Sequence, residues 1–220
     1  MASEDGSKDE IARDSFIGIL LFDVMDAIDR HDDAPTQSGK RDLIRTTFAA
    51  VEGVSWIFRE HVVEAARAMS ELEPAEEVAL SETSYQVSDQ GRITEQARYR
   101  PLLAAVRLPA RIAEKLAPTV KIDFSGRDWA HLKEAIKIRN RITHPKSRSD
   151  LILSDKDIQR SIGALFWLLN GTSDVMDAAN LSYKDYVGQL RDLLEHLNAG
   201  DPATLALYEA AAQSLQNDER

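Results

Sequence analysis

Residues Asp128–Arg148 read DWAHLKEAIKIRNRITHPKSR, and this segment sets the helical character of the chain. Its apolar residues recur at steps of three and four, the spacing that places side chains on one face of an α-helix. These residues are Trp129, Leu132 and Ile136. The spacing predicts an amphipathic helix from Asp128 to about Thr143.

The end of this predicted helix carries three side chains that could act together on an anion. Arg139 continues the apolar stripe, so it should face a neighbouring helix or a partner rather than open solvent. Pro145 disfavours the helical conformation at His144, so the helix should end near Thr143 and leave the imidazole free to turn. We therefore expect Arg139, Asn140 and His144 to surround one small anion. Histidine changes charge near neutral pH, which suits a general acid or base.

An arginine followed by a histidine five residues later is not specific by itself. The same spacing occurs at Arg191 and His196, in an acidic helical setting without a following proline. We interpret that second occurrence as coincidence. The first is distinguished by Asn directly after Arg, by Pro directly after His and by the positive charge around it.

Residues 133–148 contain six basic residues and one acidic residue, a local charge of +5 in a chain whose net charge is −10. The basic residues are Lys133, Lys137, Arg139, Arg141, Lys146 and Arg148. Three of these, spaced by four, predict a basic ridge on the solvent face of the helix. Overall acidity argues against broad DNA coating, but salt screens carboxylates beyond ~8 Å, so the local patch can still attract phosphate.

The rest of the chain also predicts helices, so the expected fold class is all-α, an up-and-down helical bundle. Apolar residues recur at helical spacing in residues 10–30, 37–70, 101–116, from 154 to about 170, and 175–198. Asp201 and Pro202 should open a short final helix. The three tryptophans at 56, 129 and 167 fall within apolar stripes, so we expect them in the core.

Two interruptions divide this helical pattern. The helical period is lost at about 81–100, where Tyr85 to Ile93 alternates around a glycine, which predicts a short loop or hairpin excursion. Gly171–Ser173 predicts a break or bend. The expected organisation is a bundle at residues 1–171 and a C-terminal helical extension at residues 172–220, packed on the same domain.

Composition excludes several classes of function. The hydrophobic content of 43% is sufficient for a core, yet no window reaches the ~18 to 20 apolar residues of a membrane span. The acidic N-terminus is unlike a signal peptide. The chain has no cysteine, which excludes disulfides, thiolate metal sites and cysteine nucleophiles. We expect a cytoplasmic protein.

The segment Arg139–Pro145, RNRITHP, resembles the signature of the HEPN superfamily, with Asp128–Trp129 and Ala135–Ile138 adding to the similarity. The similarity covers about Asp128 to Ile162. It implies an all-α bundle of four or five helices and a homodimer in which two motifs face one cleft. Many members are endoribonucleases of toxin–antitoxin, antiviral defence or RNA-processing systems, and they act without a metal or cofactor.

The resemblance also implies roles for individual residues. Arg139 would bind the scissile phosphate, His144 would transfer a proton to or from the ribose 2′-hydroxyl or the leaving oxygen, and Asn140 would orient them. The RNA backbone would be held by Lys133, Lys137, Arg141, Lys146 and Arg148. The implied partners are RNA, a second copy of the chain and a protein antitoxin or regulator, with no membrane.

Structural explanations remain open for the same residues. Arg139 could pair with an acid such as Asp23 or Asp26 on a facing helix, and His144 could be a helix C-terminal histidine stabilised by the helix dipole. The basic ridge could be an ordinary solvated face. On these grounds the rival hypothesis is a non-catalytic helical interaction module in a defence or regulatory complex.

Overall fold

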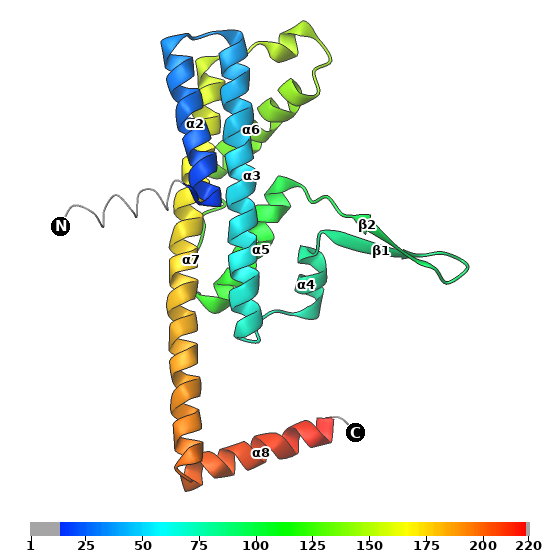
Figure 1. The fold of residues 1–220 in the computed structure, drawn as a ribbon, viewed down its shortest axis with the longest axis vertical. Coiled ribbons are helices and arrows are strands. Elements are labelled where there is room, and N and C mark those ends of the chain that lie inside the picture. Colours follow the sequence, from blue (N-terminus) through cyan, green and yellow to red (C-terminus); the bar gives the residue numbers. More distant parts are fainter. Residues whose placement is uncertain (1–13, 219–220) are drawn as a thin grey trace, which may run out of the picture.

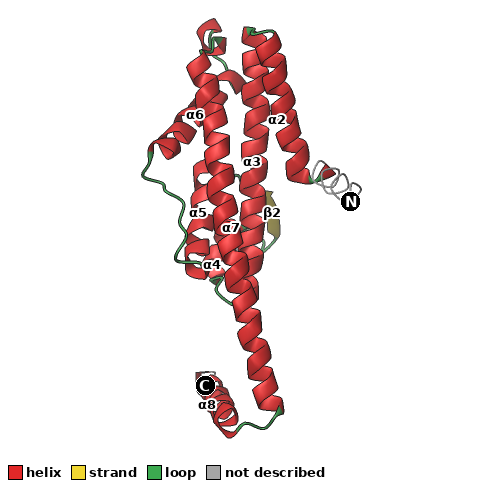
Figure 2. Cartoon of the chain, turned by 90° about the vertical axis from the view of Figure 1, so that its left-hand side faces the viewer, coloured by secondary structure: helices red, strands yellow, loops and turns green. Residues whose placement is uncertain are grey.

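The computed structural model describes residues 14–218, and this part is almost entirely helical (Figures 1 and 2). Its elements are α2 (Phe16–Asp33), α3 (Gln37–Ala68), α4 (Pro74–Leu80), β1 (Thr83–Val87), β2 (Ile93–Ala97), α5 (Leu102–Leu116), α6 (Arg127–Thr143), a 3₁₀ turn (Arg148–Leu151), α7 (Asp155–Asn198) and α8 (Pro202–Asp218). The predicted all-α helical bundle is therefore confirmed, with one small antiparallel hairpin added to it.

The first two described helices begin where short polar side chains cap them. The Ser15 hydroxyl accepts a hydrogen bond from the Gly18 N–H (3.0 Å), and the Thr36 hydroxyl accepts one from the Gly39 N–H (3.0 Å). Such caps satisfy amide groups that have no partner inside the helix. The helix expected over residues 10–30 thus begins at Phe16, while residues 10–13 lie outside the described part.

Two apolar clusters share α3 and α7 as common walls. One cluster packs residues of α2, α3, α6 and α7, including Ile44, Phe48, Leu132 and Leu165. The other packs the C-terminal half of α3 against α5 and the middle of α7, with Phe58, Val62 and Ile112 fully buried. Phe124, Trp129 and Trp167 form a ring cluster, with centroid separations of 4.9 to 6.1 Å. Phe124 and Trp167 pack against both clusters.

The expected break at Gly171–Ser173 is wrong, because α7 runs without interruption from Asp155 to Asn198. The buried Thr172 hydroxyl donates to the Leu168 carbonyl (2.7 Å), so this side chain bonds within the helix instead of ending it. At Gly171 a Cβ would lie 3.5 Å from Ile122, which places this glycine at a close approach to the 118–126 loop. The division at residue 171 therefore falls inside one helix, and the proposed domain organisation stays a prediction.

The C-terminal part of α7 extends beyond the bundle, and α8 follows at an angle (Figure 1). Ala179 is the last buried residue of α7. We call residues 180–198 the outer arm. The arm carries several half-exposed apolar side chains, which are Leu181, Tyr183, Val187, Leu190, Leu193 and Leu194.

A short helix and a hairpin connect α3 to α5. Pro74 is the first residue of α4, a helix that the sequence pattern did not predict. The predicted hairpin is confirmed: β1 and β2 pair antiparallel with Tyr85 opposite Glu95 and Val87 opposite Ile93. The hairpin projects away from the bundle (Figure 1). Within residues 14–218, no helix is both long enough and apolar enough to cross a membrane.

Candidate functional site at the end of α6

Helix α6 ends at Thr143, as predicted. The His144 N–H still bonds the Asn140 carbonyl (3.0 Å), but His144 has φ −124° and ψ 61°, outside the helical region. Pro145 explains this ending, because its ring disfavours a helical conformation in the residue before it. Past the proline, the Asp150 carboxylate accepts the backbone N–H groups of Lys146 (2.8 Å) and Ser147 (2.9 Å). These hydrogen bonds lower the pKa of Asp150 below its ordinary value.

Arg139 lies at the edge of the buried face of α6, with its side chain 29% exposed. It forms an ion pair with Glu52 of α3, and its guanidinium lies 5.5 Å from the centre of the Phe48 ring. It also donates a hydrogen bond to the Asn140 side-chain oxygen (3.1 Å). Arg139 therefore faces a neighbouring helix, as the stripe predicted. Its acidic partner is Glu52 and not Asp23 or Asp26, because α3 is the helix that brings a carboxylate to it.

A cavity of about 510 Å³ opens beside Arg139 and Asn140. It is bounded by α3, the base of the hairpin, the first turns of α5 and the C-terminal half of α6. Its charged and polar lining consists of Glu52, Ser55, Arg59, Glu82, Arg100, Arg139 and Asn140. Its volume falls within the range of ~300–1,000 Å³ that is usual for ligand sites. The predicted pair Arg139 and Asn140 is thus brought together at the wall of a cavity.

His144 is exposed and does not belong to the cavity lining. Among residues 14–218, no side chain forms a hydrogen bond or an ion pair with its imidazole. One chain therefore joins two of the three predicted site residues and leaves the third at the adjacent helix end. In one chain, therefore, only Arg139 and Asn140 of the three line the cavity.

The basic residues of the motif differ in their surroundings. Lys137 is exposed and pairs with Glu134 (2.8 Å), and this hydrogen bond lowers the pKa of Glu134. Lys133 lies 6.0 Å from the Trp129 ring centre and is exposed. Lys146 and Arg148 are exposed as well. These four side chains remain accessible to a polyanion.

Arg141 does not belong to an open basic ridge, which corrects the sequence interpretation. Its side chain is 37% exposed, and its guanidinium lies 3.8 Å from the Asp157 carboxylate and 3.4 Å from the Ile152 carbonyl. Asp157 caps the start of α7 and also bonds Ser154. Arg141 thus connects the end of α6 to the start of α7.

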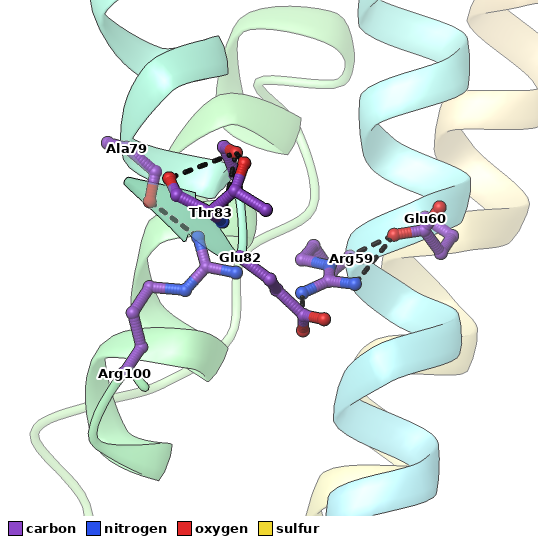
Figure 3. Close-up of polar contacts among 7 residues, drawn as sticks. Arg59, Glu60, Ala79, Glu82, Thr83 and Arg100 are labelled. Atoms are coloured by element: carbon purple, nitrogen blue, oxygen red, sulfur yellow. Dashed lines mark hydrogen bonds and ion pairs between the residues drawn. The ribbon is translucent and has the colours of Figure 1, made fainter. Parts of the chain in front are cut away.

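At the hairpin end of the cavity lies a cluster of charged residues that sequence analysis missed (Figure 3). Arg59 of α3 is 9% exposed and bonds two carboxylates, Glu60 (2.8 Å) and Glu82. Burial would lower the pKa of Arg59, but the hydrogen bonds to Glu82 and Glu60 outweigh burial and raise it. Arg59 recurs at helical spacing with the buried residues Ser55 and Val62. An arginine within a buried stripe was the available signal.

Arg100 completes this cluster from the segment before α5. Its guanidinium donates to the Ala79 carbonyl, at the end of α4 (Figure 3). Burial lowers the pKa of Arg100, and the positive charge of Arg59 lowers it further. No pattern in the sequence indicated this position, because the contact depends on how the segment after β2 lies against the end of α4.

The expected core position of Trp56 is also wrong. Its side chain is 47% exposed and lines the cavity, whereas Trp129 is 5% exposed. Tyr99, at 94% exposed, lies on the same cavity wall as Arg100. Phe166, an apolar residue of α7, is also exposed (55%). Helical spacing identified these faces as apolar but could not tell which of them another element covers.

The second occurrence of the arginine–histidine spacing has no comparable setting. Arg191 is 71% exposed on the outer arm, and its nearest carboxylates, Asp192 (3.5 Å) and Glu195 (4.0 Å), belong to its own helix. Within residues 14–218, no group of three or more histidine, aspartate or glutamate side chains is placed to hold a metal ion.

Comparisons of the chain with protein-family models, with curated proteins and with solved structures find no match.

Proposed function

We propose that this chain is a metal-independent endoribonuclease that acts as a homodimer, with Arg139, Asn140 and His144 at its reaction centre. The observation that carries the proposal is the position of Arg139 and Asn140, which are hydrogen-bonded to each other at the wall of a cavity next to a helix end that exposes His144. The resemblance of Arg139–Pro145 to the HEPN signature supports the same assignment.

The reaction follows from the chemistry of these side chains. The ribose 2′-hydroxyl attacks the adjacent phosphorus while the His144 imidazole accepts its proton; the bond from phosphorus to the 5′-oxygen breaks, and the imidazolium gives a proton to that leaving oxygen. The guanidinium of Arg139 stabilises the negative charge that develops on the phosphate oxygens. The products are a 2′,3′-cyclic phosphate and a 5′-hydroxyl.

Glu52 must yield its position for this reaction to occur. Glu52 forms an ion pair with the Arg139 guanidinium, which would have to bind the phosphate instead. The Glu52 side chain is 50% exposed, so it can turn away into solvent. Exposed ion pairs contribute only about 0–1 kcal/mol, so a phosphate can compete for Arg139. Lys133, Lys137, Lys146 and Arg148 would attract the neighbouring phosphates of the RNA, and Arg141 would maintain the shape of the helix end.

The proposed dimer supplies what one chain leaves incomplete. His144 is outside the cavity that Arg139 lines, so two motifs facing one cleft would complete each other's sites. Sedimentation at micromolar concentration is expected to give about twice the 24.6 kDa chain mass. A protein that is monomeric while it cleaves RNA would rule out this part of the proposal.

The test of the proposal is RNA cleavage in the presence of EDTA. Wild type should cut single-stranded RNA and leave cyclic phosphate ends, while Arg139→Ala and His144→Ala should lower the rate by roughly 100-fold or more. Arg191→Ala and His196→Ala are matched controls that carry the same spacing in the outer arm, and they should cut at the wild-type rate. If wild type leaves RNA intact, or if both pairs of variants cut equally well, the catalytic assignment is lost.

One observation favours a second function, a non-catalytic interaction module. The ion pair with Glu52 and the position over Phe48 give Arg139 a structural role that needs no substrate. In that case Arg139→Ala would lower stability, His144→Ala would have no effect, and RNA would remain uncut. RNA cleavage separates the two functions, because Arg139→Ala loses the contacts with Glu52 and Phe48, and therefore stability, under either of them.

A further inference from the structure

Two aromatic side chains face the same cavity as Arg139, and no part of the proposed reaction uses them. Trp56 of α3 is 47% exposed, and Phe16 holds it edge-to-face at a ring-centre distance of 5.8 Å and an angle of 69°. Tyr99 is 94% exposed on the segment that joins the hairpin to α5. Exposed aromatic rings beside a charged cavity are typical of binding sites, because leaving them in water costs free energy.

The hairpin end of the cavity carries a cation with unused hydrogen-bond donors. Arg59 is already committed to Glu60 and Glu82, so it fixes the position of Glu82. Arg100 donates to the Ala79 carbonyl and to no other residue between 14 and 218. Three arginines and two glutamates line the whole cavity. Arg100 forms no ion pair with a residue between 14 and 214, although the nearby Glu82 carboxylate attracts it, so its guanidinium can still bind an anion.

We propose that this cavity binds the unpaired nucleotide next to the scissile phosphate, with its base stacked on Trp56 and Tyr99 and its further phosphate bound by Arg100. The inference rests on the proposed function, because Arg139 at the opposite wall defines where the scissile phosphate lies. It assigns the substrate class as single-stranded RNA. Trp56, Tyr99 and Arg100 are the binding residues.

The geometry favours an unpaired base over the other anionic partners. A base inside a duplex is stacked between its neighbours, so only a single strand can place one on a side-chain ring. An acidic peptide would satisfy Arg100 but would gain little from two exposed rings. Stacking on an aromatic side chain accepts any base, so the cavity should bind single strands with little preference for sequence.

The test measures binding without cleavage. The full-length protein is titrated into a fluorescein-labelled single-stranded 10-mer with 2′-O-methyl riboses, which lack the attacking hydroxyl, and anisotropy gives the Kd at fixed salt in EDTA. Loss of stacking is worth ~1–3 kcal/mol per base, so Trp56→Leu and Tyr99→Ala should each raise the Kd by roughly 5- to 160-fold. Trp56→Phe should retain most of the affinity, and binding should quench tryptophan emission in wild type but not in Trp56→Leu.

The matched control is Tyr85→Ala, which removes an exposed tyrosine of the same hairpin (65% exposed) that does not line the cavity. Its Kd should stay within about two-fold of wild type. The proposal is overturned if Trp56→Leu and Tyr99→Ala bind like wild type, if a duplex of the same sequence binds equally well with the same dependence on Trp56, or if a polyglutamate peptide competes as well as the RNA.

These results separate the subsite from the nuclease. Cleavage by wild type together with unchanged Kd values in the aromatic variants would remove the subsite and leave the proposed function standing. A Kd that depends on Trp56 and Tyr99 in a protein that leaves unmodified RNA uncut would remove the catalytic assignment and leave a site for single-stranded RNA.

Discussion

The end of α6 and the outer arm of α7 contain the same spacing of arginine and histidine in opposite surroundings. At the end of α6, Arg139 is 29% exposed, pairs with a carboxylate of another helix and lines a cavity. On the arm, Arg191 is 71% exposed and meets only carboxylates of its own helix. The spacing of an arginine and a histidine therefore does not by itself indicate a site. It becomes informative only where another helix packs against the arginine and the helix ends at the histidine.

The largest expected difference between the two regions concerns a pair of helical glycines. At Gly53 of α3, a Cβ would lie 2.3 Å from Leu20 Cδ1 and 3.4 Å from Phe16, whereas at Gly188 on the arm it would meet nothing within 4 Å. Gly53→Val should therefore destabilise the protein by about 1–3 kcal/mol. Gly188→Val should change stability by less than about 0.5 kcal/mol. Urea unfolding of both variants checks this, and equal effects would mean that α2 does not pack on α3 as described.

A smaller difference is expected for the two arginines themselves. Arg139→Ala should lower the free energy of unfolding by about 1 kcal/mol, because it removes the ion pair to Glu52 and the contact with Phe48. Arg191→Ala should change it by less than about 0.5 kcal/mol. Thermal unfolding at low and moderate salt measures both. A larger loss of stability in Arg191→Ala than in Arg139→Ala would mean that the contacts of Arg139 with Glu52 and Phe48 do not stabilise the fold.

The smallest expected effect is on the pKa of two aspartates, one in the segment after α6 and one in the segment after α7. Asp150 accepts backbone N–H groups of Lys146 and Ser147, and Asp201 accepts the N–H and the hydroxyl of Thr204. These hydrogen bonds lower the pKa of both carboxyl groups. Their stabilising effect should be complete above the ordinary aspartate pKa of ~3.9 and should be lost as pH falls through the lowered values.

An NMR titration of the carboxyl carbons measures these two pKa values. Both should lie below ~3.9, the ordinary value for aspartate. An Asp150 that titrates at or above that value would mean that the segment after Pro145 is not held in the described conformation. Asp150→Asn is the matching variant, and it should leave the pKa of Asp201 unchanged.

Local rules predicted the helix end at the motif, but the partners there needed the whole fold. Pro145 and the apolar spacing before it placed the end of α6 at Thr143. Glu52 and Arg100 were not predicted, because their contacts depend on how α3 and the hairpin pack against α6 and α5. The exposure of Trp56 was missed for the same reason. The sequence placed Trp56 on an apolar face of α3, but its exposure depends on how much of that face the first turn of α2 covers.

The helix break predicted from turn-favouring residues at Gly171–Ser173 is absent for a physical reason. Gly171, Thr172 and Ser173 favour a turn in isolation, but the buried Thr172 hydroxyl bonds back to the Leu168 carbonyl, and Gly171 lies where a Cβ would make only ordinary contact with Ile122. All three residues therefore lie within the continuous helix α7. The intrinsic preference of a residue for a turn is weak, and its surroundings in the folded protein can override it.

The continuity of α7 has a consequence for how its amide hydrogens exchange with solvent. Up to Ala179 the helix is buried against its neighbours, so opening a backbone hydrogen bond there requires opening the bundle. Beyond Tyr183, a residue of the arm that lines a cavity with α3, the turns depend mainly on their own hydrogen bonds, which are marginal without packing. A single unbroken helix thus contains two regimes of local unfolding, and deuterium uptake should rise along its length although its geometry does not change.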